Sequence, residues 1–143
     1  MKKSLHLVLD TNKFIFGITG LPNHPSAVLL DTIVERASQI NIHIPRTIFN
    51  EVRKNLRPSF FNEFITFINT LSINVDEDFI VPFEISVKYE MMGLKPANTL
   101  IASYTELMDA AALISENRHF LSRQPNLPFK VMSASQCLKM LLK

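Results

Sequence analysis

Four polar positions in this chain have the residue types that hold a divalent cation. They are Asp10-Thr11-Asn12, Glu51, Asn98 and Ser115-Glu116-Asn117, which carry side-chain oxygens and follow or adjoin short apolar segments. Carboxylates that converge on one pocket can bind Mg²⁺ or Mn²⁺, which prefer hard oxygen ligands. A cation held in this way lowers the pKa of bound water and stabilises the charge that develops during displacement at phosphorus.

Each of these residues also has a structural alternative. Asp10 is equally compatible with capping a helix that follows it, as Asp commonly does. Glu51 could be solvated, or paired with Lys54 or Asn55. Asn98, near the start of an expected helix, could bond backbone N–H groups there. The residue types alone leave both interpretations open.

The apolar pattern predicts an alternation of short strands and helices. Strands are expected at 5–9, 42–44, 73–75, 112–115 and 129–132. Helices are expected at 12–17, 26–37, 47–56, 60–71, 82–92, 96–108 and 133–142. This rhythm indicates an α/β fold with one open, mostly parallel sheet that helices cover on both faces. Ligands bind beyond the carboxyl ends of such strands, where the polar positions fall.

Length and composition limit the class of protein. The 143 residues suit a single domain over 1–143. Thirteen acidic residues against fifteen Lys and Arg give a formal net charge of +2, which excludes a histone-like surface. The single Cys137 excludes a disulfide framework and a cysteine-based zinc site. No apolar run approaches the roughly eighteen residues of a membrane span, so we expect a cytoplasmic protein.

Four segments, taken in order, resemble the motifs of the PIN domain, especially the VapC-like single-domain toxins of VapBC toxin–antitoxin pairs. They are 9–15 (LDTNKFI), 44–52 (IPRTIFNEV), 93–102 (GLKPANTLIA) and 113–120 (LISENRHF). Each motif alone is a weak signal. All four occur in the right order and spacing, and the match covers nearly the whole chain.

The resemblance implies a three-layer α/β/α sandwich with a four- or five-stranded sheet. It also implies a Mg²⁺- or Mn²⁺-dependent endoribonuclease that hydrolyses RNA phosphodiester bonds with activated water. The implied catalytic and metal-site positions are Asp10, Glu51, Asn98 and Asn117. Ser115 would hydrogen-bond the carboxylates, and Asn12 would orient Asp10 from outside the metal shell. A cognate antitoxin and a second copy of the chain are the implied protein partners.

Asn98 departs from the family pattern, which usually has Asp at this position. An amide offers a carbonyl oxygen but no negative charge, so weaker Mg²⁺ binding is expected. Three interpretations stay open. The residue could be a natural variation in a working site, with Glu116 or substrate phosphate supplying charge. The chain could be a weakened PIN-like module that binds RNA or a protein partner without cutting. The residue could also be an introduced Asp→Asn replacement.

Basic residues flank the four segments, and we expect them to contact RNA phosphates. They are Lys13, Arg46, Arg53, Lys95 and Arg118. Such a rim would give RNA affinity that falls with added salt, whereas scattered surface cations would only aid solubility. The wide apolar stripe over 60–68 indicates either a well-buried helix or a contact with an antitoxin or a second copy.

Other Asp-centred α/β proteins fit the sequence less well. A phosphatase of the haloacid-dehalogenase type needs a second Asp two residues after the first, where this chain has Asn12. A receiver domain needs an acidic pair before its phosphorylated Asp, and none precedes Asp10. The three glycines form no phosphate-binding loop.

Overall fold

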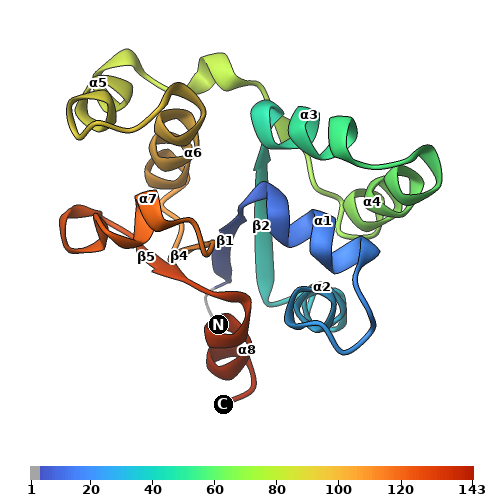
Figure 1. Ribbon diagram of the computed structural model, residues 1–143. Coiled ribbons are helices and arrows are strands. Elements are labelled where there is room, and N and C mark those ends of the chain that lie inside the picture. The colour runs from blue at the N-terminus through green and yellow to red at the C-terminus, as the bar shows by residue number, and fades with distance from the viewer. Residues whose placement is uncertain (1–3) are drawn as a thin grey trace.

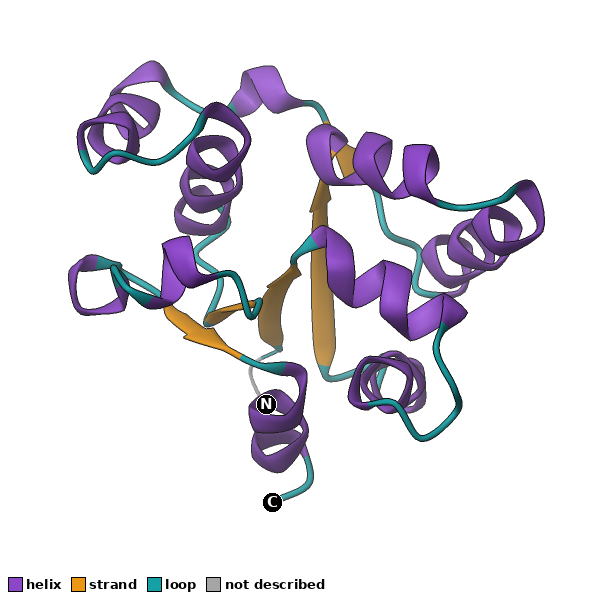
Figure 2. Cartoon of the chain, in the orientation of Figure 1, coloured by secondary structure: helices purple, strands orange, loops and turns teal. Residues whose placement is uncertain are grey.

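The computed structural model describes residues 4–143, apart from the side chain of Gln124. The strands are β1 (Leu5–Leu9), β2 (Ile40–Pro45), β3 (Val75–Asp76), β4 (Ala112–Ile114) and β5 (Lys130–Met132). The helices are α1 (Thr11–Thr19), α2 (Pro25–Glu35), α3 (Arg46–Asn55), α4 (Pro58–Thr70), α5 (Phe83–Met91), α6 (Pro96–Leu107), α7 (Arg118–Leu121) and α8 (Ala134–Leu141), with 3-10 turns at Asp78–Ile80 and Gln124–Asn126 (Figure 2). The five strands form one parallel sheet flanked by helices, which confirms the predicted fold class.

The strand order β3-β2-β1-β4-β5 places a topological switch point between β1 and β4. The chain fills the sheet from β1 to β3 on one side and then returns to build β4 and β5 on the other (Figure 1). Connections leave such a point in opposite directions, which opens a crevice beyond the carboxyl ends of the two strands. Because Leu9 pairs with Ile114, the residues that follow them meet at this crevice.

The sheet is buried because helices cover both of its faces. Leu7, Val8 and Leu9 are fully buried, as expected for a central parallel strand with no solvent-facing side. Helices α1, α2 and α8 pack together on one side, while α5 and α6 pack together on the other (Figure 1). The central strand β1 ends at Leu9, and Asp10 is the first residue of the segment that leaves the core.

Helix boundaries differ from the sequence expectations mainly at prolines. Pro58 opens α4 two residues before its expected start, and Pro25 opens α2 one residue before its expected start. Proline suits the first helical turn because its missing N–H would have no partner there. The short helix α7 and the two 3-10 turns were not predicted, since three or four residues are too few to show a period.

The apolar stripe of α4 faces mostly inward. Phe64, Phe67 and Ile68 are buried, and Phe61 is half-buried with its ring centroid 5.8 Å from that of Phe49. This burial favours the interpretation as a core helix. Strongly exposed large apolar side chains lie elsewhere, at Leu21, Phe79, Phe83, Met91 and Leu142. No helix in the described part of the chain is long and apolar enough to cross a membrane.

A histidine pair links the two central strands. His6 on β1 and His43 on β2 stack with ring centroids 5.1 Å apart, and His6 Nδ1 lies 2.8 Å from His43 Nε2. One ring must therefore donate and the other accept, which two protonated rings cannot do. Burial, and then the neighbouring His6, lower the pKa of His43 from its usual 6.5, against a smaller opposing effect of Asp76.

We expect this pair to make the fold less stable in mild acid. Below pH 6.5 the unfolded chain binds a proton at His43 that the folded chain does not, so the free energy of unfolding falls as pH decreases from there. Urea denaturation between pH 7.5 and 5 measures this slope. His43→Gln should flatten it, whereas the exposed His119→Gln should not. An unchanged slope in His43→Gln would assign the acid sensitivity to other groups.

Candidate active site

The structure brings the four predicted site residues around one cavity at the switch point. This carboxylate cavity has a volume of about 240 Å³. Its walls include Asp10 at the end of β1, Glu51 on α3, Asn98 on α6 and Asn117 before α7. The four side chains come from four separate elements, and all are partly exposed. They can therefore meet a bound ligand together.

Asp10 caps a helix, one of the two roles that the sequence left open, and its carboxylate also lies at the cavity. Its Oδ1 accepts a hydrogen bond from the Thr11 backbone N–H at 2.8 Å, which makes it the N-cap of α1. Its Oδ2 accepts from the buried Ser115 Oγ at 2.8 Å. The Asn117 backbone N–H donates to the same Ser115 oxygen at 3.0 Å. These bonds hold the carboxylate in one orientation at the edge of the cavity.

Glu51 is held by a residue to which the sequence assigned no separate role. The buried Thr11 donates from Oγ1 to Glu51 Oε2 at 2.8 Å. Thr11 thus contacts both acids, through its N–H and its hydroxyl. The signal available in the sequence was its place directly after Asp10, but the partner lies 40 residues away.

The two amides of the site bond to each other. Asn117 uses Oδ1 to accept from the His119 backbone N–H at 2.9 Å, as the N-cap of α7. This fixes its amide, so that Nδ2 faces Asn98 Oδ1 across 3.5 Å. At position 117 the cavity therefore meets hydrogen-bond donors, and Asn117 is better placed to hold another ligand than to bind a cation itself.

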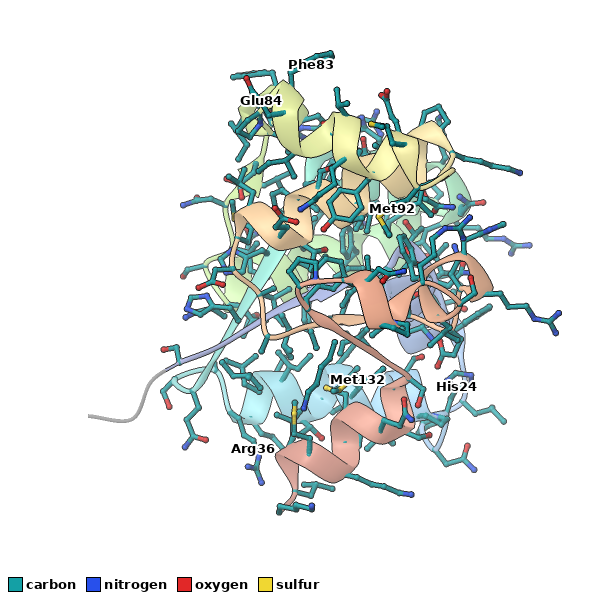
Figure 3. The ribbon with its side chains drawn as sticks, turned by 90° about the vertical axis from the view of Figure 1, so that its left-hand side faces the viewer. His24, Arg36, Phe83, Glu84, Met92 and Met132 are labelled. Atoms are coloured by element: carbon teal, nitrogen blue, oxygen red, sulfur yellow. The ribbon has the colours of Figure 1, made fainter. Side chains whose placement is uncertain are left out.

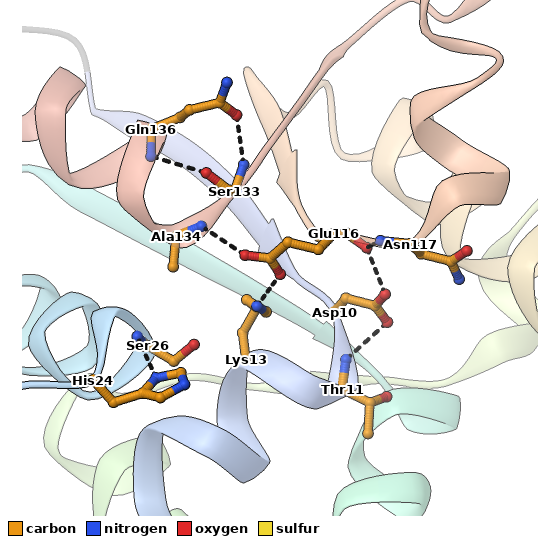
Figure 4. Close-up of polar contacts among 11 residues, drawn as sticks. Asp10, Thr11, Lys13, His24, Ser26, Glu116, Asn117, Ser133, Ala134 and Gln136 are labelled. Atoms are coloured by element: carbon orange, nitrogen blue, oxygen red, sulfur yellow. Dashed lines mark hydrogen bonds and ion pairs between the residues drawn. The ribbon is translucent and has the colours of Figure 1, made fainter. Parts of the chain in front are cut away.

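A second cavity, the side cavity, adjoins the first and has a volume of about 220 Å³. Its lining is Asp10, Asn12, Lys13, Phe16, Ser115, Glu116 and Asn117. Lys13 is buried with its amine paired to the Glu116 carboxylate, whose other oxygen accepts from the Ala134 N–H at the start of α8 (Figure 4). The ion pair therefore joins α1, the segment after β4, and α8.

The residues expected around the site lie in different settings. Asn12 is exposed and lines both cavities, while the hydrogen bonds described above reach Asp10 from Thr11 and Ser115. Of the five basic residues, Arg53, Lys95 and Arg118 are exposed. Arg46 pairs with Glu77 at 2.8 Å and lies over the ring of Phe49. The roles expected of Asn12 and of the basic residues stay predictions.

The donor set fits a weakly held, hard cation. Asp10 and Glu51 supply carboxylate oxygens, and Asn98 supplies an amide oxygen. Oxygen ligands of this kind suit Mg²⁺ or Mn²⁺ rather than zinc. Within residues 4–143, no group of three or more His, Cys, Asp or Glu side chains is arranged to hold a metal ion. A cation here would depend on two charges from the protein.

The solved structures that share this fold include two complexes. One is VapBC2 from Rickettsia felis bound to a DNA fragment from its promoter, with a TM-score of 0.64 and 17% identity over 90% of this chain and 100% of that chain. The other is FitAcB from Neisseria gonorrhoeae, with a TM-score of 0.62 and 14% identity over 90% and 98%. No family model and no curated protein sequence match this chain. The likeness therefore shows the fold alone.

Proposed function

We propose that this chain is a metal-dependent endoribonuclease of the PIN type and the toxin of a toxin–antitoxin pair. The observation that carries the proposal is the meeting of Asp10, Glu51, Asn98 and Asn117 around one cavity at the switch point. The sequence resemblance to VapC-like toxins and the fold shared with VapBC2 and FitAcB support it. The partner would be a cognate antitoxin, as in those pairs.

The chain's own residues have defined tasks in this proposal. Asp10 and Glu51 hold Mg²⁺ or Mn²⁺ with help from the Asn98 oxygen, and Thr11 and Ser115 fix the two carboxylates. The bound cation would activate water and stabilise charge on the phosphate. Bonds that preset these side chains avoid the cost of ordering them during the reaction.

Substrate binding would use the remaining cations. The exposed Arg53, Lys95 and Arg118 would contact the RNA backbone, and each phosphate contact adds salt-dependent affinity. A second candidate function is binding of RNA without cleavage. Asn98 favours this second function, because with an amide at this position the site has only two carboxylates, fewer than the family pattern.

A cleavage assay on single-stranded RNA tests the proposal. We expect the native chain to cut in Mn²⁺ or Mg²⁺ and to stop in excess chelator. The Asp10→Asn variant, purified in parallel, controls for contaminating ribonuclease. Equal cleavage by both proteins would contradict the proposal. RNA binding by the native chain without any metal-dependent cleavage would establish the second candidate instead.

A further inference from the structure

An exposed aromatic ring lies beside the proposed catalytic centre. Phe16 on α1 is 46% exposed and lines the side cavity, which shares Asp10, Asn12 and Asn117 with the carboxylate cavity. Phe16 follows Asn12 by four residues, so the two side chains occupy one face of α1 about one turn apart. On this face of α1, one turn farther from the carboxylates than Asn12, an apolar ring is therefore exposed to solvent.

A second ring backs the first. His24 lies with its ring centroid 5.8 Å from that of Phe16, at an interplanar angle of 44°. The His24 ring is fixed because its Nδ1 accepts from the Ser26 N–H at 3.1 Å and caps α2 (Figure 4). In the neutral ring, Nε2 therefore carries the proton.

The turn between α1 and α2 is shaped to bring these rings together. A Cβ at Gly20 would lie 2.4 Å from the Phe16 carbonyl oxygen and 3.3 Å from His24 Cβ, so no side chain fits there. The Gly20 N–H instead closes α1 by donating to the same Phe16 oxygen at 2.9 Å. The aromatic pair is thus preorganised by backbone and cap, which lowers the entropy cost of binding to it.

We infer that Phe16, backed by His24, is a stacking platform for a nucleobase of single-stranded RNA whose phosphate lies in the carboxylate cavity. This inference rests on the proposed function and names its substrate class. A base can stack on a side chain only when it is released from a helix, so the platform selects unpaired RNA. Stacking tolerates any base, while the Asn12 and Asn117 side chains in the adjoining wall offer polar groups to base edges.

Binding of a single-stranded RNA that contains 2-aminopurine tests the platform, because stacking quenches the fluorescence of this base. We measure titrations in EDTA, where the native chain should leave the RNA uncut. Phe16→Ala should weaken binding roughly 5- to 100-fold and reduce the quenching, since one base–aromatic stack is lost. Phe16→Tyr should retain both. Duplex RNA of the same sequence should show no difference between Phe16→Ala and the native chain.

The matched control is Phe83→Ala. Phe83 is 74% exposed on α5, at the far end of the molecule from His24 (Figure 3). The Phe83→Ala variant should bind RNA like the native chain. Thermal unfolding should show that both alanine variants are folded. Native-like binding and quenching by Phe16→Ala would overturn the inference, as would equal losses in both alanine variants.

The outcome separates this inference from the proposed function. Metal-dependent cleavage together with native-like binding by Phe16→Ala would retain the nuclease and remove the platform. Phe16-dependent quenching by a chain that never cuts RNA would retain the platform and remove the nuclease.

Discussion

Asn98→Asp should raise Mn²⁺ affinity and RNA cleavage about ten- to hundredfold. Affinity at oxygen sites for divalent cations follows the number of charged ligands, and this variant raises the carboxylates around the cavity from two to three. Changes around a metal site commonly alter affinity or activity by this factor. Titration calorimetry with Mn²⁺ and the cleavage assay measure the two effects separately.

The surroundings of position 98 suit a carboxylate. Asn117 Nδ2 already faces Asn98 Oδ1, because the cap of α7 fixes the Asn117 amide. A carboxylate there would receive a charge-assisted hydrogen bond, which is stronger than the present long contact. The replacement is nearly isosteric, so the variant should fold like the native chain.

Asp10→Asn provides the opposite change. It should lower cleavage by at least about 100-fold, since one carboxylate would remain at the cavity. Asn caps helices as well as Asp does, so the start of α1 should persist; its Nδ2 cannot accept from the Ser115 hydroxyl, so a modest loss of stability is expected, and thermal unfolding should show the variant folded. The three proteins thus form a series with one, two and three carboxylates at an unchanged fold. If calorimetry and cleavage do not rise along this series, the metal-site role of position 98 is wrong.

The sequence could predict that the candidate site residues lie together, because its apolar pattern shows where the strands end. One buried apolar run stops at Asp10 and a second stops at Ser115. Ligands bind beyond the ends of parallel strands, so these two positions are enough to predict where a ligand would bind. Strand order then decides whether such ends meet. Here β1 and β4 are neighbours, so the two residues bond directly.

Long-range pairing could not be predicted in the same way. The family resemblance, and no pattern in the residues themselves, implied that Ser115 would hydrogen-bond the carboxylates; its hydroxyl reaches Asp10 from 105 positions away. The pairing register of the two strands determines this contact, and the residue pattern within one strand does not show how that strand aligns with another. The bond from Thr11 to Glu51 could not be predicted for the same reason, although Thr11 was noted as a residue that could orient the Asp10 carboxylate.

Lys13 shows how burial can contradict residue type. A lysine beside the first motif was expected on the surface, where it could contact phosphate. Its side chain is instead 6% exposed, and its partner Glu116 follows 103 residues later. Lysine is almost never buried unless it is paired. The partner on another element therefore explains the burial, and its identity depends on the fold.

Glu116→Gln should destabilise the fold by about 1–3 kcal/mol, whereas Lys13→Met should have little effect or a small stabilising one. Removing one partner of a buried ion pair leaves the other charge buried without compensation. That charge would be the Lys13 amine. The Glu116 side chain is half exposed, so water screens the pair and keeps the cost below that of a fully buried one. Urea denaturation of each variant measures the free energy of unfolding.

The two variants remove the same ion pair, so the difference between their free energies of unfolding is the informative quantity. A simple loss of attraction would lower stability equally in both, while a desolvated amine penalises only Glu116→Gln. The double variant should then lie near Lys13→Met, since no buried charge remains in it. Equal destabilisation by the two single variants would contradict this account.

Lys13→Met also tests the role that the sequence suggested: unchanged RNA affinity would make Lys13 a structural residue, and a marked loss would show that its amine reaches the substrate.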